Sequence, residues 1–220
     1  VIGDGVLPSI SDARNRLLTP EALIVPRASK MYIQPVSYRS KGPPGILLDD
    51  INVMRTDQLV LSFPYHSGKL QRCDSTEYEI LGPALEVFDF DWSLAEPGSL
   101  EEGRTNQSPL TLKFSRGGVC NCLMILFTLQ MDAKEGMEKA DGEDYDPHVD
   151  NDYSSGMDNE YTHWDNPMRF LPVEINVAQG DELQVVCSQN AHDLDFIRLF
   201  GVTNTMLREP GGLGSRHLVD

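Results

Sequence analysis

The first periodic pattern along the chain is helical. Ser9 is followed three residues later by Asp12, with Pro8 just before it, which is the pattern of a capping box at the start of a helix. Thr19-Pro20 then ends the predicted helix. Between these signals, apolar residues recur at the spacing of one helix face: Ile10, Ala13, Leu17 and Leu18. The sequence therefore predicts one short N-terminal helix, capped by Ser9.

After Pro26 the apolar residues follow the shorter period of strands. Residues 119–131 are almost wholly apolar and predict a central strand. Residues 84–94 alternate, which places four side chains on one face: Glu86, Phe88, Phe90 and Trp92. The other predicted strands are a run through Met31, Ile33 and Val36, then 58–63, 77–81, 110–114, 169–177, 182–188 and 194–200.

One short helix followed by many strands, with turn residues between them, predicts a mainly β fold, a barrel or a sandwich. Strands do not alternate with long helices, so a doubly wound sheet is excluded. No run approaches the roughly 18 apolar residues of a membrane-spanning helix, and we expect no membrane partner. The chain starts without Met, at Val1, and we expect a fragment or a processed chain.

Acidic residues are concentrated in one segment. The 220 residues carry a formal charge of −16, and residues 132–160 hold 11 Asp or Glu against 2 Lys. Because Lys and Arg are not clustered, we expect no nucleic-acid partner. The alternating acids from Asp144 to Asp152 could be a calcium site, but neither the Gly nor the Glu of an EF-hand loop falls in place. A solvated, mobile loop that is dispensable for folding fits the composition better.

The four cysteines predict no disulfide scaffold and no metal site. Cys120 and Cys122 form a C-x-C, and alternation places both on the same face of the predicted central strand. Without a second pair or a histidine pair at zinc spacing, we interpret the cysteines as reduced, buried thiols. Asn106 stands in a formal glycosylation signal, although nothing else indicates secretion.

The glycine clusters form no cofactor motif, since none lies between a predicted strand and a helix. Residues 161–166 combine Tyr161, Thr162, His163 and Trp164 just before a predicted strand. An imidazole there can orient a carboxylate, and an indole can stack under a cation. The alternative is a turn whose Trp164 simply packs on the sheet.

Four motifs in order resemble those of the protein arginine N-methyltransferases. Thr162-His163-Trp164 resembles the family's Thr-His-Trp loop, and the strand, the turn at Gly180-Asp181 and the next strand follow as in the family. Asp193-Leu194-Asp195-Phe196 resembles its closing strand, with His192 where Arg is usual. At the other end, residues 2–9 resemble the segment after the family's double-glutamate loop, most similar to the type III, tandem-module branch. Val25-Pro26-Arg27-Ala28 into Tyr32 resembles the start of its barrel.

The resemblance implies how the chain is organised. Residues 1–27 would be a helix and connector to an upstream nucleotide-binding domain, 28–202 a β-barrel, and 203–220 a flexible tail. Within the barrel, 41–81 is the candidate for the dimerisation arm and 132–160 is the acidic insertion.

The resemblance also implies an activity: transfer of a methyl group from S-adenosylmethionine to arginine guanidinium groups of proteins, histones included. His163 would orient the upstream glutamates, while Thr162, Trp164 and Tyr161 would bind substrate. S-adenosylmethionine would be held upstream, so this chain alone is predicted to be inactive. Expected partners are arginine-rich proteins and a homodimer or tandem-module pseudo-dimer, in the cytoplasm or nucleus.

Two other hypotheses fit the same residues. One is a non-catalytic β-barrel interaction module with an acidic ligand loop, and the other is a pseudo-enzyme module that stabilises a catalytic partner. A Gly-rich strand–turn–helix segment upstream of Val1 would favour the enzyme.

Overall fold

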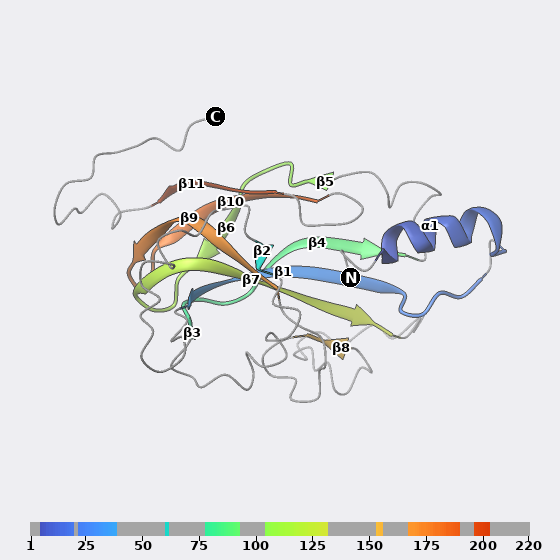
Figure 1. The fold of residues 1–220 in the computed structure, drawn as a ribbon, viewed down its shortest axis with the longest axis horizontal. Coiled ribbons are helices and arrows are strands. Elements are labelled where there is room, and N and C mark those ends of the chain that lie inside the picture. Colours follow the sequence, from blue (N-terminus) through green and yellow to red (C-terminus); the bar gives the residue numbers. More distant parts are fainter. Residues whose placement is uncertain are drawn as a thin grey trace, which may run out of the picture.

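The computed structural model describes residues 5–19, 22–38, 60–61, 78–92, 104–131, 153–155, 167–189 and 196–202. This part of the chain has one helix, α1 (Val6–Arg16), and otherwise strands (Figure 1). The strands are β1 (Ala28–Tyr38), β2 (Val60–Leu61), β3 (Tyr78–Ile80), β4 (Leu85–Asp91), β5 (Arg104–Thr105), β6 (Leu110–Lys113), β7 (Gly118–Gln130), β8 (Tyr153–Ser154), β9 (Met168–Val177), β10 (Glu182–Gln189) and β11 (Phe196–Val202).

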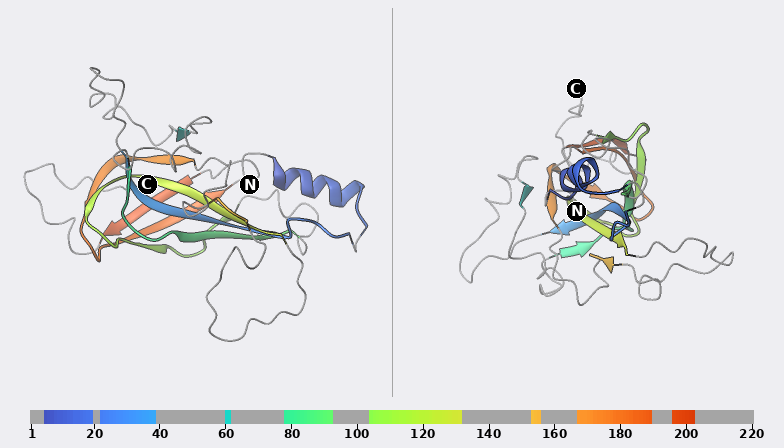
Figure 2. Two further views of the ribbon diagram at one scale, coloured as in Figure 1. Left: turned by 90° about the horizontal axis from the view of Figure 1, so that it is seen from below. Right: turned by 90° about the vertical axis from the view of Figure 1, so that its right-hand side faces the viewer.

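These strands form two antiparallel sheets. The seven-stranded sheet has the order β2-β9-β7-β1-β3, with β4 also on β1 and β8 also on β7. The four-stranded sheet has the order β11-β10-β5, with β6 also on β10. Strongly bent strands wrap the two sheets around a common interior, and α1 projects at one end (Figure 2). The mainly β prediction is confirmed. Because no ladder joins the sheets within the described residues, closure into a barrel stays a prediction.

Each predicted strand has a counterpart among the described residues, although β2 is described only as Val60–Leu61 and the start of the predicted strand 194–200 lies outside them. The expected central strand is β7. One of its edges pairs with β1 in unbroken register from Ala28–Gln130 to Val36–Cys122. The sequence patterns do not predict β5 and β8. β5 lies in a polar segment and β8 lies in the acidic segment 132–160. Two-residue strands carry no periodicity, so their pairing comes entirely from tertiary contact.

The larger core lies between the two sheets, with contributions from both. It contains Phe90, Trp92, Leu123, Leu183 and Val185, all buried. A smaller cluster uses only strands of the seven-stranded sheet, among them Val36, Met124 and Phe170. That sheet is therefore apolar on both faces, as the unbroken apolar run of β7 predicts.

The prediction that Cys120 and Cys122 share a face is wrong. Cys120 packs in the larger core, whereas Cys122 packs in the smaller cluster. The register between β7 and β9 shifts between these two residues: Cys120 pairs with Ile175 and Cys122 with Phe170, so four residues of β9 lie opposite Asn121. The Asn121 side-chain amide pairs with the backbone of Tyr38, accepting from the N–H and donating to the carbonyl, each at 2.8 Å. The alternation of β7 is interrupted at this irregularity, so Cys120 and Cys122 lie on opposite faces.

A bulge in β4 changes the alternation that the sequence predicts for residues 84–94. Met31 pairs with Phe88 but Tyr32 pairs with Glu86, so Val87 is the additional residue of β4. Phe88, Phe90 and Trp92 are buried as expected, but Glu86 is exposed and binds Lys30 at 2.9 Å. The carboxylate of Glu86 is thereby kept out of the core.

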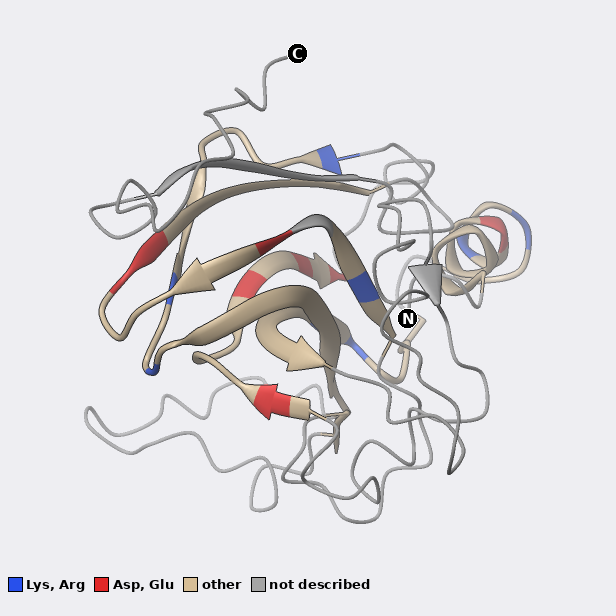
Figure 3. Cartoon of the chain, turned by 60° about the vertical axis from the view of Figure 1, so that its left-hand side comes forward, with Lys and Arg blue, Asp and Glu red and all other residues tan. Residues whose placement is uncertain are grey.

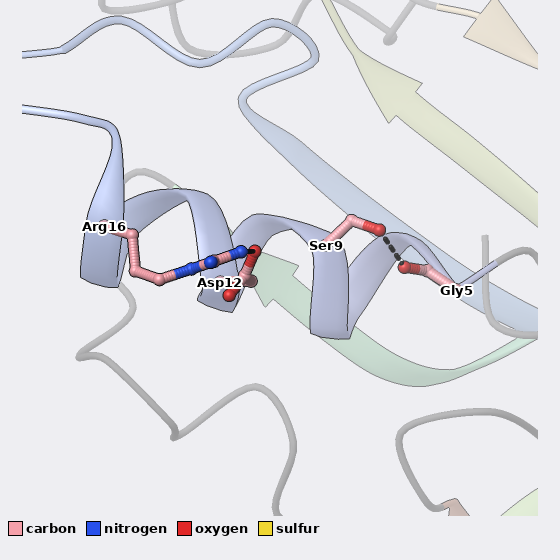
Figure 4. Close-up of polar contacts among 4 residues, drawn as sticks. All are labelled: Gly5, Ser9, Asp12 and Arg16. Carbon is pink, nitrogen blue, oxygen red and sulfur yellow. Dashed lines mark hydrogen bonds and ion pairs between the residues drawn. The ribbon is translucent and has the colours of Figure 1, made fainter.

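The helix is one turn longer at its start than predicted, and Ser9 does not cap it. Gly5, with a φ of 69°, is the N-cap residue, and the Ser9 hydroxyl donates to the Gly5 carbonyl at 2.7 Å (Figure 4). The buried face holds Leu7 and Ser11 instead of Leu17, which is 75% exposed. On this face the Arg14 guanidinium donates to the Trp92 carbonyl at 2.6 and 3.1 Å. The hydrogen bonds from Arg14 to Trp92 set the orientation of α1 more than the predicted apolar face does.

Side chains of the β5 segment connect the two sheets where no ladder does. Arg104 donates to the Asp89 carbonyl at 3.1 Å, with its guanidinium over the Phe90 ring. Asn106 donates to the Val87 carbonyl at 2.8 Å and accepts from the Cys187 N–H at 2.9 Å. The amide of Asn106 is therefore a structural link between β4 and β10.

Gly82 marks a close approach between the sheets. A Cβ there would lie 2.1 Å from the Lys113 carbonyl oxygen of β6, and backbone cannot give way as a side chain would. We predict that Gly82→Ala lowers the free energy of unfolding by at least ~3 kcal/mol, measured by urea denaturation. The control is Gly180→Ala, which has a φ of +88° but open space around its Cβ, and should cost only ~1–2 kcal/mol. Equal losses for the two variants would contradict this close contact.

The base of a candidate substrate loop

All four predicted site residues, Tyr161, Thr162, His163 and Trp164, lie outside the described residues, as does most of the acidic segment 132–160. The structure describes the two strands that flank residues 156–166, which are β8 before them and β9 after them. The candidate site is therefore built from its base on β7.

The first end of this segment is held by β8 and Ser155. Thr128 and Leu129 of β7 pair with Ser154 and Tyr153. Ser155 continues the pairing, since its N–H donates to the Phe127 carbonyl at 2.9 Å and its hydroxyl accepts from the Phe127 N–H at 2.9 Å. Ser155 is fully buried, so this hydroxyl satisfies a backbone donor that water does not reach.

The second end is held by the start of β9. The Ile125 N–H donates to the Pro167 carbonyl at 2.8 Å, and Met124 pairs with Met168 directly after it. Because β1 occupies the other edge of β7, β8 and β9 share one edge and are in line. Residues 156–166 therefore leave and rejoin the sheet at positions two residues apart on β7, Phe127 and Ile125.

The sequence predicts that residues 134–158 form a mobile loop that is dispensable for folding, but Tyr153–Ser155 form part of the sheet. The Tyr153 ring lies 6.2 Å from the Phe127 ring. Nothing in the sequence indicates this, because a Tyr-Ser-Ser run among acids resembles a loop. The sequence does not predict the structural role of Ser155. That role depends on its pairing with Phe127 of β7, which only the tertiary structure shows.

Lys, Arg, Asp and Glu positions are spread along several of the strands drawn in Figure 3. Several of them pair across strands: Lys30 with Glu86, Arg116 with Glu79, and Lys113 with Glu182 at 3.9 Å. The hydrogen bond that Lys30 donates to the Glu86 carboxylate raises the pKa of Lys30. These pairs are exposed and contribute little to stability.

Within the described ranges, no group of three His, Cys, Asp or Glu is placed to hold a metal ion. In the same ranges no helix has the length and apolarity needed to cross a membrane. Cys120, Cys122 and Cys187 are buried free thiols, as the sequence predicts for them. Burial raises the pKa of Cys120 and of Cys187 to about 12. Such thiols stay protonated and are poor nucleophiles and poor metal ligands.

The Gly117-Gly118 pair does not fit S-adenosylmethionine. Gly117 and Gly118 lead into a strand, and the space at their Cα atoms is taken by the Val177 carbonyl and the Leu81 side chain. These two glycines therefore do not offer the open backbone donors between a strand and a helix that nucleotide cofactors use.

Comparison with known proteins gives one relative of known activity. An arginine N(omega)-methyltransferase of Streptomyces achromogenes subsp. streptozoticus is 28% identical over 143 residues, covering 60% of this chain and 34% of the relative. The match thus spans about a third of that protein. A chain of the Trypanosoma brucei PRMT1 enzyme–prozyme heterotetrameric complex with AdoHcy aligns with a TM-score of 0.49 and 13% identity, covering 92% of this chain and 65% of that one. No protein-family model matches the sequence.

The anchoring at Ser155 predicts where the acidic segment can be shortened. Replacing 135–150 by a short Gly-Ser linker should leave the melting temperature nearly unchanged, because loop length costs little and this stretch is poor in apolar side chains. Extending the deletion through Asp158 removes β8 and exposes Phe127. That variant should lose ~2–4 kcal/mol of stability. Calorimetry on the two deletion variants measures this difference, and equal melting temperatures would contradict the packing of β8.

The buried thiols predict a chemical response. In a Cys73→Ser variant at pH 8, the native protein should take up almost no thiol reagent within an hour, and the unfolded protein should take up three equivalents, one for each remaining cysteine. Unfolded thiols titrate near ~8.5. Because the folded pKa of Cys120 and Cys187 is about 12, stability should fall as the pH rises from ~8.5 toward 12. Rapid labelling of the native variant would contradict this burial.

Proposed function

We propose that this chain is the barrel half of a protein arginine N-methyltransferase, which transfers a methyl group to arginine guanidinium groups of protein substrates. The observation that carries the proposal is the 28% identity to an arginine N(omega)-methyltransferase over 143 residues. The order of the Thr-His-Trp and flanking motifs supports it. In this proposal the two sheets close into one barrel, and the whole protein belongs to the type III, tandem-module branch.

His163 would orient carboxylates contributed by another part of the enzyme, while Thr162, Trp164 and Tyr161 would form the wall of the guanidinium cleft. Two anchors support this assignment, because a segment held at both ends can present an imidazole at a defined place. A carboxylate site must stay ionised and aimed to bind a guanidinium cation, and an imidazole donor favours both. Catalysis would then consist mainly of positioning and electrostatics.

The acidic segment 132–160 would attract arginine-rich substrates. Its 11 acidic residues against 2 Lys come soon after the end of β7 at Gln130. Long-range attraction of this kind raises association rates and weakens with salt.

The remaining parts of the proposal concern the rest of the protein. S-adenosylmethionine would be bound by a separate nucleotide-binding domain, so residues 1–220 alone would be inactive. Residues 1–27 would connect the two domains, and 41–81 would form the dimerisation arm of a homodimer or tandem-module pseudo-dimer. We place the enzyme in the cytoplasm or nucleus, with histones among its substrates.

The test is His163→Ala in the full-length protein, with His148→Ala as the matched control within the acidic segment. Losing one preorganising donor should lower kcat by about tenfold to a thousandfold with the melting temperature kept. His148→Ala should retain turnover. The measurement is methyl transfer to an arginine-rich peptide, together with calorimetry.

Normal turnover of a folded His163→Ala enzyme would remove the role assigned to His163. Absence of methyl transfer by the unmodified full-length protein would instead favour a non-catalytic interaction or pseudo-enzyme module.

A further inference from the structure

Within the described residues, four buried side-chain atoms have no hydrogen-bond partner. They are the Ser29 hydroxyl oxygen, the Trp92 indole nitrogen and both amide atoms of Gln189. Each of the three residues is 2% exposed or less. A buried polar atom without a partner costs free energy, so native proteins satisfy nearly all of them, and ordered water does so where no protein group reaches.

Ser29 and Trp92 are neighbours on the inner face of the seven-stranded sheet. Ser29 of β1 pairs with Phe90 of β4, and two residues further along, the Trp92 N–H donates to the Arg27 carbonyl at 2.8 Å. Side chains in this diagonal relation across antiparallel strands are within reach of each other when one of them is an aromatic ring. Phe90 and Trp92 both pack in the larger core, and Ser29 alternates with Met31 of the same core. The hydroxyl and the indole N–H therefore face the interior together.

Gln189 approaches the same part of the interior from the other sheet. It is the last residue of β10, and the alternation of that strand places it on the face of Cys187, which packs in the larger core. Its partner in β5 is Arg104, whose guanidinium carbon lies 5.0 Å from the centre of the Phe90 ring. Phe90 thus connects the two sheets here, with Ser29 as its strand partner and Gln189 beyond Arg104.

We propose that Ser29, Trp92 and Gln189 form an internal hydration site, in which one ordered water molecule bridges the two sheets. A buried water makes about three hydrogen bonds, and it can both donate and accept. The three side chains offer a matching set, because the indole N–H donates, the hydroxyl donates or accepts, and the amide does both. Since a water needs volume as well as partners, it fits beside Ser29, whose side chain is much smaller than that of Met31 further along β1.

This water connects the sheets at the end where α1 docks. Further from the helix, Asn106 joins β4 to β10 through its amide, and Arg104 of β5 donates to the Asp89 carbonyl of β4. The water continues this line of hydrogen bonds between the sheets to Trp92, whose carbonyl accepts from Arg14 of α1. The inference is independent of the proposed function, because it assigns no residue a contact with substrate.

The first test uses Ser29→Ala and Gln189→Met in the full-length protein. Each substitution removes one partner of the water with little change in side-chain shape. Each should raise the unfolding equilibrium constant, measured by urea denaturation, by about fivefold to thirtyfold. If no water is bound, the same substitutions remove a polar group that has no partner, and they should lower that constant. An unchanged or lower constant for either variant would overturn the proposal.

The two substitutions should also depend on each other, although they lie in different sheets. Because both groups bind the same water, the effect of the double variant should fall short of the product of the single effects by at least about threefold. The matched control is Gln184→Met, the same change on β10, where the amide donates to Thr111 of the same sheet at 3.0 Å. Combined with Ser29→Ala, Gln184→Met should give the product of the single effects. The same product for Gln189→Met would overturn the shared water.

A direct readout does not depend on whether the variants fold. A high-resolution crystal structure of the unmodified full-length protein should show one water within ~3.2 Å of the Trp92 indole nitrogen, the Ser29 hydroxyl oxygen and an amide atom of Gln189. A protein atom bound to the indole nitrogen, or no water beside it, would overturn the proposal. Methyl transfer enters neither measurement, so failure of the proposed function is a separate result.

Discussion

The structure depends on the pairing of both edges of β7. A buried strand must satisfy every backbone N–H and carbonyl, because water does not reach them. One edge is served by β1 in unbroken register. The other edge is shared by β9 and β8 in line, with Asn121 at a bulge on one side and Ser155 at the end of β8. The unusual features of the fold arise where this second edge changes partner.

Polar side chains take over backbone pairing at three places in the structure. The Asn121 amide pairs with Tyr38, the Ser155 hydroxyl accepts from Phe127, and Asn106 joins β4 to β10. Each substitutes for a strand that ends too early or lies in the other sheet. Because a buried unsatisfied donor costs ~1–3 kcal/mol, these few residues have large effects on a marginally stable domain.

Several residues that look chemical in the sequence are structural in the fold. The C-x-C cysteines are split between two apolar clusters, and the Asn106 amide bonds to strands of both sheets. The proposed chemistry instead depends on residues 161–164, and the sheet holds the residues on either side of that segment at Phe127 and Ile125.

The sequence predicts the mainly β class and nine of the strands, the central strand included. Long periodic runs such as 119–131 form strands because their apolar side chains must be buried. It also indicated the Thr162–Trp164 segment through a motif. Tertiary structure alone decided the bulges at Val87 and Asn121, the docking of α1 on Trp92, and the pairing of β5 and β8. These features depend on which backbone groups lack a partner once the sheets meet. No pattern within a single segment encodes that.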